Sequence, residues 1–163
     1  MALSQIAPAL SDLWLNDGLM MQCQQLLIPL QLLALQLMSL VLNLQEHWLP
    51  TVACPMDNII STMPLLCTLY VSSFYLKLAT LSHGFSDLKI LDYCVIPQEL
   101  EEFITILSNP STLPALRKVT LILRVSYGDS ESEDESSQGD VENFDTDMFK
   151  VLRALCLKRG IKI

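Results

Sequence analysis

Residue types that commonly do chemistry are sparse in this chain, and their spacing matches no catalytic or metal-binding motif. The two histidines, His47 and His83, lie far apart in the sequence. No two cysteines form a CxxC pair, so the spacing of a zinc site is absent. Gly-x-Ser-x-Gly, HExxH and glycine-rich phosphate-loop motifs are also absent, and the chain has only 5 glycines. The cysteines concerned are Cys23, Cys54, Cys67, Cys94 and Cys156. Because these motifs are absent, we expect a protein that is not an enzyme and that uses no metal or cofactor.

A repeated pattern indicates the elements that must position any binding residues. Five segments share the order apolar-x-x-apolar-x-apolar, and they begin at residues 10, 37, 66, 88 and 116, which gives steps of 27, 29, 22 and 28. Alternation of this kind is typical of a strand with one buried face. The apolar positions are Leu10/Leu13/Leu15, Leu37/Leu40/Leu42, Leu66/Leu69/Val71, Leu88/Leu91/Tyr93 and Leu116/Val119/Leu121.

Two of the stretches between these segments predict helices. Residues 97–108 begin with Pro97 and three glutamates and carry Leu100, Phe103, Ile104 and Leu107 on one face. Residues 146–159 predict a second helix, which ends in basic residues before Gly160. Its predicted apolar positions are Met148, Val151, Leu152 and Leu155. Residues 161–163 then predict one more short strand.

Together these elements predict an α/β fold in which strand–helix units repeat. A single unit would expose its apolar face, whereas stacked units bury one continuous core. We expect about five such units over residues 1–163, forming one repeat domain. Parallel strands would line the concave face of this solenoid and helices the other face.

The strand side chains that point away from the helices are the candidate binding residues. The register predicts three rows across the strands, and the middle row contains Trp14, Val41, Tyr70, Asp92 and Thr120. Tryptophan and tyrosine are favoured anchors because each combines a large apolar area with a polar group. The predicted partner-binding residues are Trp14, Asn43, Thr68, Tyr70, Asp92, Lys118 and Thr120.

The negative charge of the chain is concentrated in one segment. The formal net charge is −8, with 18 acidic and 10 basic residues, and the stretch from Asp129 to Asp147 holds many acids and no base. Residues 126–145 therefore predict a disordered acidic insertion. Ser130, Ser132 and Ser137 each have an acid three positions later, which is typical of sites for acidic-directed kinases. Because the remainder is nearly neutral, we expect no binding to nucleic acid.

Cellular location is suggested by the cysteines and by the amino-terminal sequence. The odd number of scattered cysteines favours reduced thiols and an intracellular protein of the cytoplasm or nucleus. The first basic residue is Lys77, so no signal peptide is predicted. Residues 26–44 are uncharged and long enough to offer an alternative, a membrane anchor. Polar residues and Pro29 within that stretch favour a buried core segment instead.

These features resemble leucine-rich-repeat proteins, in particular the long-repeat subclass with a helix in each repeat. Residues 113–121 (LPALRKVTL) and 159–163 (RGIKI) resemble the irregular repeats of fungal F-box-like proteins. The asparagine ladder of regular repeats is missing, which implies irregular units. The F-box itself is also missing from this sequence.

The resemblance implies a non-catalytic protein-interaction module that recognises a protein partner, as the substrate-recognition subunits of ubiquitin ligases do. A role as a ubiquitin-ligase adaptor would require an F-box upstream of this sequence. An incomplete fragment of a longer repeat protein, without an independent function, is a further alternative. It predicts exposed apolar ends, because terminal repeats need polar caps.

Overall fold

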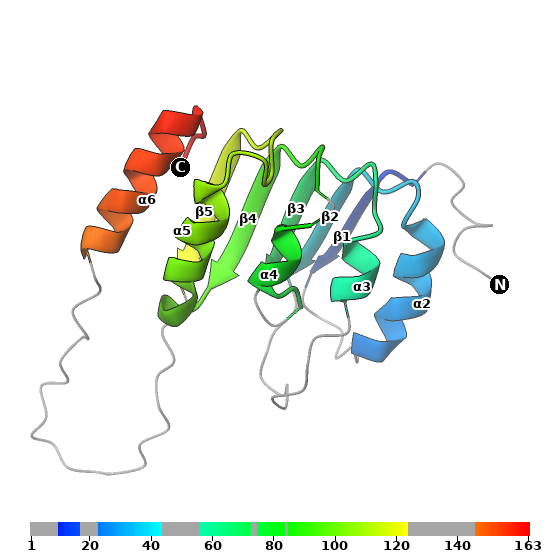
Figure 1. Cartoon of the computed structure of the whole chain (residues 1–163). Coiled ribbons are helices and arrows are strands. Elements are labelled where there is room, and N and C mark those ends of the chain that lie inside the picture. Colours follow the sequence, from blue (N-terminus) through cyan, green and yellow to red (C-terminus); the bar gives the residue numbers. More distant parts are fainter. Residues whose placement is uncertain (1–9, 17–22, 44–55, 73–74, 84, 124–145) are drawn as a thin grey trace, which may run out of the picture.

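The computed structural model describes residues 10–16, 23–43, 56–72, 75–83, 85–123 and 146–163. Five parallel strands alternate with helices along the chain, which confirms the predicted α/β class (Figure 1). The strands are β1 (Asp12–Asn16), β2 (Ser39–Asn43), β3 (Thr68–Ser72), β4 (Ile90–Val95) and β5 (Lys118–Leu123). The helices are α2 (Cys23–Leu33), α3 (Asp57–Ile60), α4 (Leu78–Leu81), the short 3₁₀ helix η1 (Pro97–Glu99), α5 (Leu100–Ser108) and α6 (Thr146–Arg159).

The sheet has the simplest possible order, β1-β2-β3-β4-β5, and every strand pairs in parallel with its neighbour in sequence. The register aligns equivalent positions of the sequence repeat. One aligned row consists of Leu13, Leu40, Leu69, Leu91 and Val119. The predicted strand positions and their alignment are therefore confirmed.

A repeated backbone contact sets the entry into each strand. The carbonyls of Ser11, Met38, Cys67 and Lys89 each accept two hydrogen bonds, from consecutive N–H groups at the start of the next unit. These bonds are 2.7–3.0 Å long. Because the same carbonyl position is used at each step, every strand begins level with the one before it.

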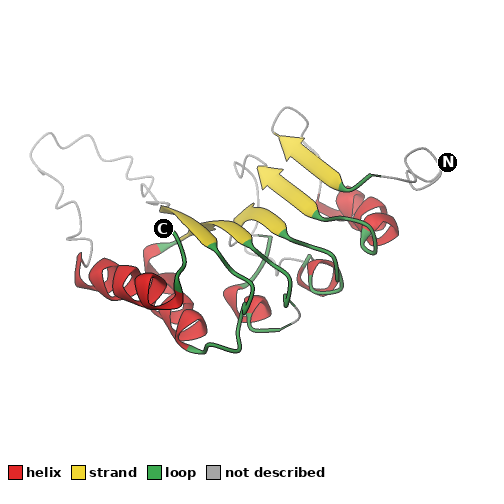
Figure 2. Ribbon diagram, turned by 90° about the horizontal axis from the view of Figure 1, so that it is seen from above, coloured by secondary structure: helices red, strands yellow, loops and turns green. Residues whose placement is uncertain are grey.

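All of the described helices lie on one side of the sheet, and they fan out along the outer side of a bent row of strands (Figure 2). Alternate residues of each strand therefore have different surroundings. Leu40, Leu69, Leu91 and Tyr93 face the helices and are fully buried. The leucines that open the pattern in four of the units are buried as well, namely Leu37, Leu66, Leu88 and Leu116.

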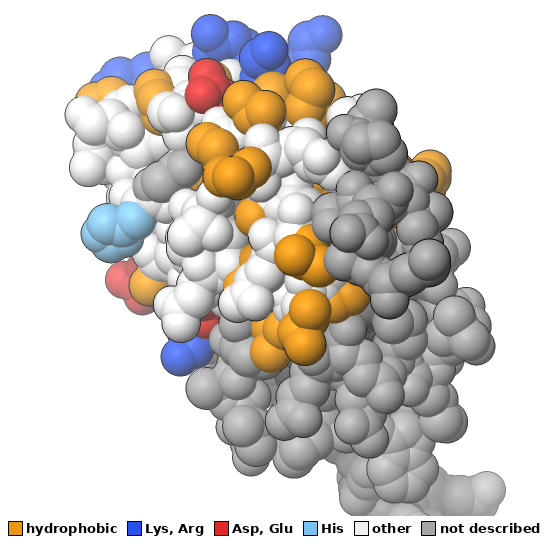
Figure 3. All heavy atoms as spheres, turned by 90° about the vertical axis from the view of Figure 1, so that its right-hand side faces the viewer, with side chains coloured by type: hydrophobic (Ala, Val, Ile, Leu, Met, Phe, Trp, Pro, Cys, Tyr) orange, Lys and Arg blue, Asp and Glu red, His pale blue; other side chains and the backbone are white. Residues whose placement is uncertain are grey.

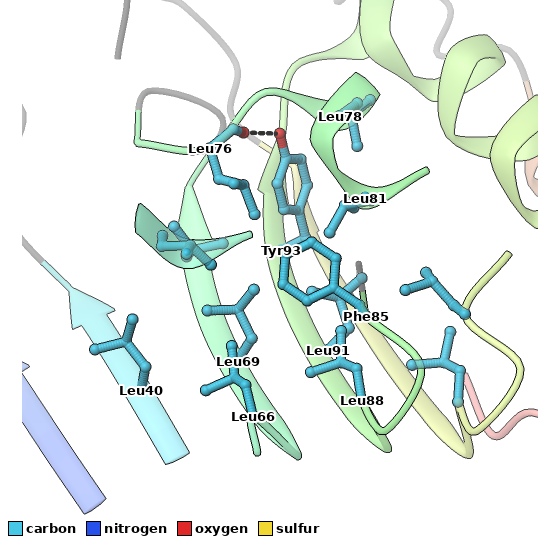
Figure 4. Close-up of a cluster of buried hydrophobic side chains, with 14 of the residues drawn as sticks. Leu40, Leu66, Leu69, Leu76, Leu78, Leu81, Phe85, Leu88, Leu91 and Tyr93 are labelled. Atoms are coloured by element: carbon cyan, nitrogen blue, oxygen red, sulfur yellow. Dashed lines mark hydrogen bonds between the residues drawn. The ribbon is translucent and has the colours of Figure 1, made fainter. Parts of the chain in front are cut away.

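Tyr93 shows how the centre of this core is held together (Figure 4). Its hydroxyl donates a hydrogen bond of 2.7 Å to the carbonyl of Leu76, so the one polar atom of the ring is satisfied. Its ring is stacked on Phe103 of α5, with centroids 6.4 Å apart and planes inclined by 10°. Burial, followed by nearby acidic groups, raises the pKa of Tyr93, so the hydroxyl stays protonated.

The helix predicted over residues 97–108 is present as η1 followed by α5. Pro97 begins η1, and the Glu99 carboxylate accepts a hydrogen bond of 3.3 Å from the N–H of Ile96. Four apolar residues of α5 are buried against the sheet, namely Leu100, Phe103, Ile106 and Leu107. Leu100, Phe103 and Leu107 of the predicted apolar face are therefore confirmed, whereas the fourth predicted residue, Ile104, is only partly buried, and Ile106 is buried in its place.

The helix predicted over residues 146–159 is α6, and Gly160 follows it with the expected positive φ of 69°. One predicted position is wrong, because Val151 is 54% exposed rather than part of the apolar face. Leu152 and Cys156, which are four residues apart, make the buried contact instead. The helix is rotated so that this pair faces the core.

The short strand predicted over residues 161–163 is reduced to one bridge between Lys162 and Lys118. Lys162 donates to the carbonyl of Arg117 and accepts from the N–H of Val119, both at 2.8 Å. Ile161 is buried in the core. The turn after α6 therefore brings a single residue into register with β5.

In the described parts of the connections after β2 and β3, the helices are the one-turn elements α3 and α4. Asp57 joins these two helices. Its Oδ1 accepts hydrogen bonds of 2.8 Å from the N–H of Lys77 and from the hydroxyl of Thr80. The α3 carboxylate therefore caps the start of α4 from the neighbouring unit.

The uncharged stretch after residue 25 and the acidic segment were both singled out in the sequence. Residues 26–43 are split between α2 and β2. Over the described part of the chain, no helix is both long and apolar enough to cross a membrane. The acidic segment 126–145, with Ser130, Ser132 and Ser137, lies outside the described residues.

Candidate functional site

The sheet has a second face, opposite the helices, which no described helix covers (Figure 2). We call it the open face. Its described side chains come from alternate strand residues and are mostly half-buried or exposed. They are Asp12, Trp14, Ser39, Val41, Asn43, Thr68, Tyr70, Ile90, Asp92, Cys94, Lys118, Thr120 and Ile122.

The predicted middle row is continuous across all five strands. Successive strand pairings align Trp14 with Val41, Val41 with Tyr70, Tyr70 with Asp92, and Asp92 with Thr120. Trp14 and Thr120, at the two ends, are exposed, and the three residues between them are half-buried. The row therefore places an aromatic ring beside a carboxylate at its centre and a second aromatic ring at one edge.

The remaining predicted binding residues lie in the rows on either side. Thr68 lies between Ser39 and Ile90, and Lys118 ends the same row on β5. Asn43 pairs with Asn16 in the third row, at the carboxyl ends of β1 and β2. Every predicted partner-binding residue is therefore on the open face, although Asn43, at the end of β2, and Lys118, at the start of β5, are three strands apart.

Asp92 is the residue of the open face that has an unsatisfied hydrogen-bond acceptor. Its Oδ1 atom is buried, yet it has no hydrogen-bond partner among the described residues. Leaving a buried polar group unpaired costs about 1–3 kcal/mol. A donor supplied from outside the chain at this point would offset that cost.

The titratable neighbours of Asp92 are held in their protonated forms. Burial, then Cys94 and Asp92, raises the pKa of Tyr70. Burial, then the charge of Glu99, raises the pKa of Cys94. A thiol with a raised pKa is a poor nucleophile. Burial therefore favours the protonated phenol and thiol at the centre of the open face, and both groups can donate hydrogen bonds.

The described residues contain no group of three or more His, Cys, Asp or Glu side chains that could hold a metal ion. His83 is exposed just after α4, and His47 lies outside the described residues. The predicted absence of catalysis remains a prediction, because residues beyond the described ranges also belong to the chain.

A hollow between α6 and the loop that leads from α5 to β5 contains basic groups, one of which already has a structural role. Arg117, Lys158 and Arg159 line it. The Arg159 guanidinium donates hydrogen bonds of 2.8–3.0 Å to the carbonyls of Leu107, Thr112 and Leu113. The sequence indicated only a favourable helix-end charge at Arg159. Its partners lie about fifty residues away, and no local pattern points to them.

Comparison with protein-family models, with curated proteins and with solved structures gives no match to this chain. The open face itself is therefore the basis for assigning a function.

Proposed function

We propose that this protein is a non-catalytic protein-interaction module, built as an irregular leucine-rich-repeat-like solenoid, that binds a protein partner on its open face. The fold supports this because strands aligned one per unit present their outward side chains as a continuous surface. Repeat proteins commonly bind partners on such extended surfaces.

The composition of the open face supports binding to a protein. Trp14 and Tyr70 each offer a large ring with a polar group, and such residues are enriched at the energetic centres of interfaces. Val41 and Ile90 add half-buried apolar area around them. Lys118, at the margin, and Asp92, at the centre, are charges that can select a complementary partner.

The unpaired Oδ1 of Asp92 is the observation that carries the proposal. A carboxylate in a buried position without a donor lowers stability. Residues that lower the free energy of unfolding are typical of functional sites, where the same residues contribute to binding. The partner is accordingly expected to place an N–H or ammonium donor against Asp92, with apolar contacts to Tyr70.

The resemblance to fungal F-box-like proteins extends this proposal to substrate recognition in a ubiquitin ligase. That extension depends on an F-box upstream of this sequence. An intracellular location accords with it, because the described cysteines Cys67, Cys94 and Cys156 are free thiols.

Affinity capture from a native lysate, without detergent, tests the proposal. The wild-type chain is compared with the double variant Tyr70→Ala plus Asp92→Lys, and captured proteins are quantified by mass spectrometry. We expect at least one protein that is enriched by the wild type to be reduced tenfold or more by the variant. Reversing the charge at Asp92 leaves a cation facing the partner's donor, which is unfavourable.

A matched control changes an equally polar pair on the helix side, Thr105→Ala plus Glu101→Lys, both exposed on α5. This control should retain the partner. Circular dichroism must show that all three proteins have the same strand and helix content. Identical capture by the three folded proteins would contradict a role for the open face.

A further inference from the structure

The end of the sheet at β1 exposes an unusual amount of apolar surface. Five large apolar side chains there are 45–76% exposed, namely Trp14, Ile28, Leu32, Leu35 and Met38. Ile28 and Leu32 lie one turn apart on α2, and Leu35 and Met38 follow in the turn that leads to β2. Figure 3 views this end and shows hydrophobic side chains gathered on it. We call these five residues and the outer edge of β1 the β1 end.

The backbone of the β1 end is also open to pairing. β1 is the first strand of the sheet and pairs only with β2 among the described strands. Its outer N–H and C=O groups can therefore accept another strand. Natural edge strands are commonly protected by charged side chains, lysine above all, or by proline. Asp12–Asn16 contains no lysine or proline, and its one charged residue is the first, Asp12. The surface thus combines a strand edge with an adjoining apolar helix face.

The opposite end of the sheet differs in both respects. Lys162 already bridges to β5, and α6 packs beside α5. Apolar side chains are exposed on α6 too, but Lys150, Arg153 and Lys158 accompany them on the same helix. Two such surfaces would repel each other. The segment Cys23–Leu33 that forms α2, in contrast, has no charged residue.

The sequence of β1 is symmetrical in polarity about its central residue. It reads Asp-Leu-Trp-Leu-Asn, so reversal of the strand leaves the pattern unchanged. In an antiparallel pair centred on Trp14, each Trp14 would lie opposite its own copy. Leu13 would lie opposite Leu15, and Asp12 opposite Asn16, with each pair on one face of the sheet. A two-fold axis requires this kind of self-complementarity.

We propose that a second copy of this chain binds at the β1 end, with the two β1 strands antiparallel and Trp14 opposite Trp14. The two sheets then form one continuous sheet, and the α2 helices of both copies lie on the same side of it. In Figure 2 the described helices all lie on one side of the sheet, as this arrangement of two copies requires. Leu13 and Leu15, which are only partly buried in one copy, become covered. This inference does not depend on what the open face binds.

Sedimentation velocity of the purified full chain over a hundredfold concentration range tests this proposal. We expect a monomer–dimer equilibrium without larger species, since an isologous contact closes on itself. The variant Ile28→Glu plus Leu32→Glu should raise the dissociation constant at least tenfold, because it brings four carboxylates together beside the axis. The matched control Val151→Glu plus Leu157→Glu, on the exposed side of α6, should leave it unchanged.

Disulfide cross-linking tests the register independently of any loss of folding in the charged variant. Trp14→Cys should form a disulfide-linked dimer through residue 14, identified by mass spectrometry of the linked peptide. Asp12→Cys alone should not, whereas a mixture of Asp12→Cys and Asn16→Cys chains should link 12 to 16. A wild-type protein that stays monomeric, that assembles without limit, or that dimerises equally well in the Ile28/Leu32 variant would overturn the proposal.

Discussion

Tyr70 and Tyr93 lie on adjacent strands of the same sheet but on opposite faces, and their surroundings have little in common. Tyr93 faces the helices, is fully buried, stacks on Phe103 and donates a hydrogen bond from its hydroxyl to a backbone carbonyl. Tyr70 faces away from the helices, is half-buried and lies beside Asp92. The first ring is part of the core, and the second is part of a surface.

This contrast shows that alternate residues of each strand have two separate roles, because one set packs in the core and the other forms the open face. The residues on the helix side, such as Leu69 and Leu91, are apolar and are buried in the core. The open-face residues mix aromatic, charged and small polar side chains, and one of them has an unpaired buried oxygen. Stability should therefore depend mainly on the first set, and binding on the second.

The largest expected difference between the faces concerns two consecutive residues of β4. Leu91→Ala should lower the free energy of unfolding by about 3 kcal/mol, because it leaves a cavity in a close-packed core. Ile90→Ala, on the half-buried open face, should cost about 1 kcal/mol, since less apolar area is lost. Urea unfolding followed by circular dichroism measures both. Equal losses would show that something covers the open face as fully as the helices cover the other.

A smaller difference in the free energy of unfolding is expected between phenylalanine substitutions of the two tyrosines. Tyr93→Phe removes the hydrogen bond to Leu76 and leaves that carbonyl without its donor, so the free energy of unfolding should fall by about 1 kcal/mol. Tyr70→Phe should change it by less than about 0.5 kcal/mol, as is usual for positions at the surface. The same urea experiment compares them. A larger loss for Tyr70→Phe would place its hydroxyl in a structural role.

The smallest effect is expected to have the opposite sign. Asp92→Asn replaces a buried charged oxygen by a neutral amide of the same shape, so stability should rise by about 0.5 kcal/mol. Asp12→Asn, on the same face but exposed at the edge, is the matched control and should change stability little. Thermal unfolding of both variants and the wild type provides the measurement. A clear loss of stability in Asp92→Asn would mean that the carboxylate has a structural partner.

The positions of the strands were predictable because their signal is local, although before residue 60 the sequence left the exact repeat register open. Leucines at constant offsets, with alternating neighbours, specified both where each strand lies and which residues pair across it. The helix over residues 146–159 was predictable for the same reason, from its charges and Gly160. Val151 was assigned to the wrong face because neighbouring apolar residues on a helix differ little in pattern, and the packing partner decides the rotation.

The candidate site was predictable as a set of outward positions but not in its energetics. Register alone placed Tyr70 beside Asp92. That Asp92 has a buried oxygen without a donor depends on the neighbouring strands and their side chains together, which no single segment encodes. The one-turn helices α3 and α4, joined through Asp57, were likewise not predictable from their own short sequences.

By itself, the sequence determined the α/β class, the five strands and the register of the strands after residue 60, because these follow from periodicity along each segment. The tertiary structure alone decided which faces and ends no described element covers. It assigned Arg159 to three distant carbonyls and left Ile28, Leu32 and Leu35 outside the core. The physical reason is that periodicity orients a side chain relative to its own element, whereas burial depends on whichever other element packs against it.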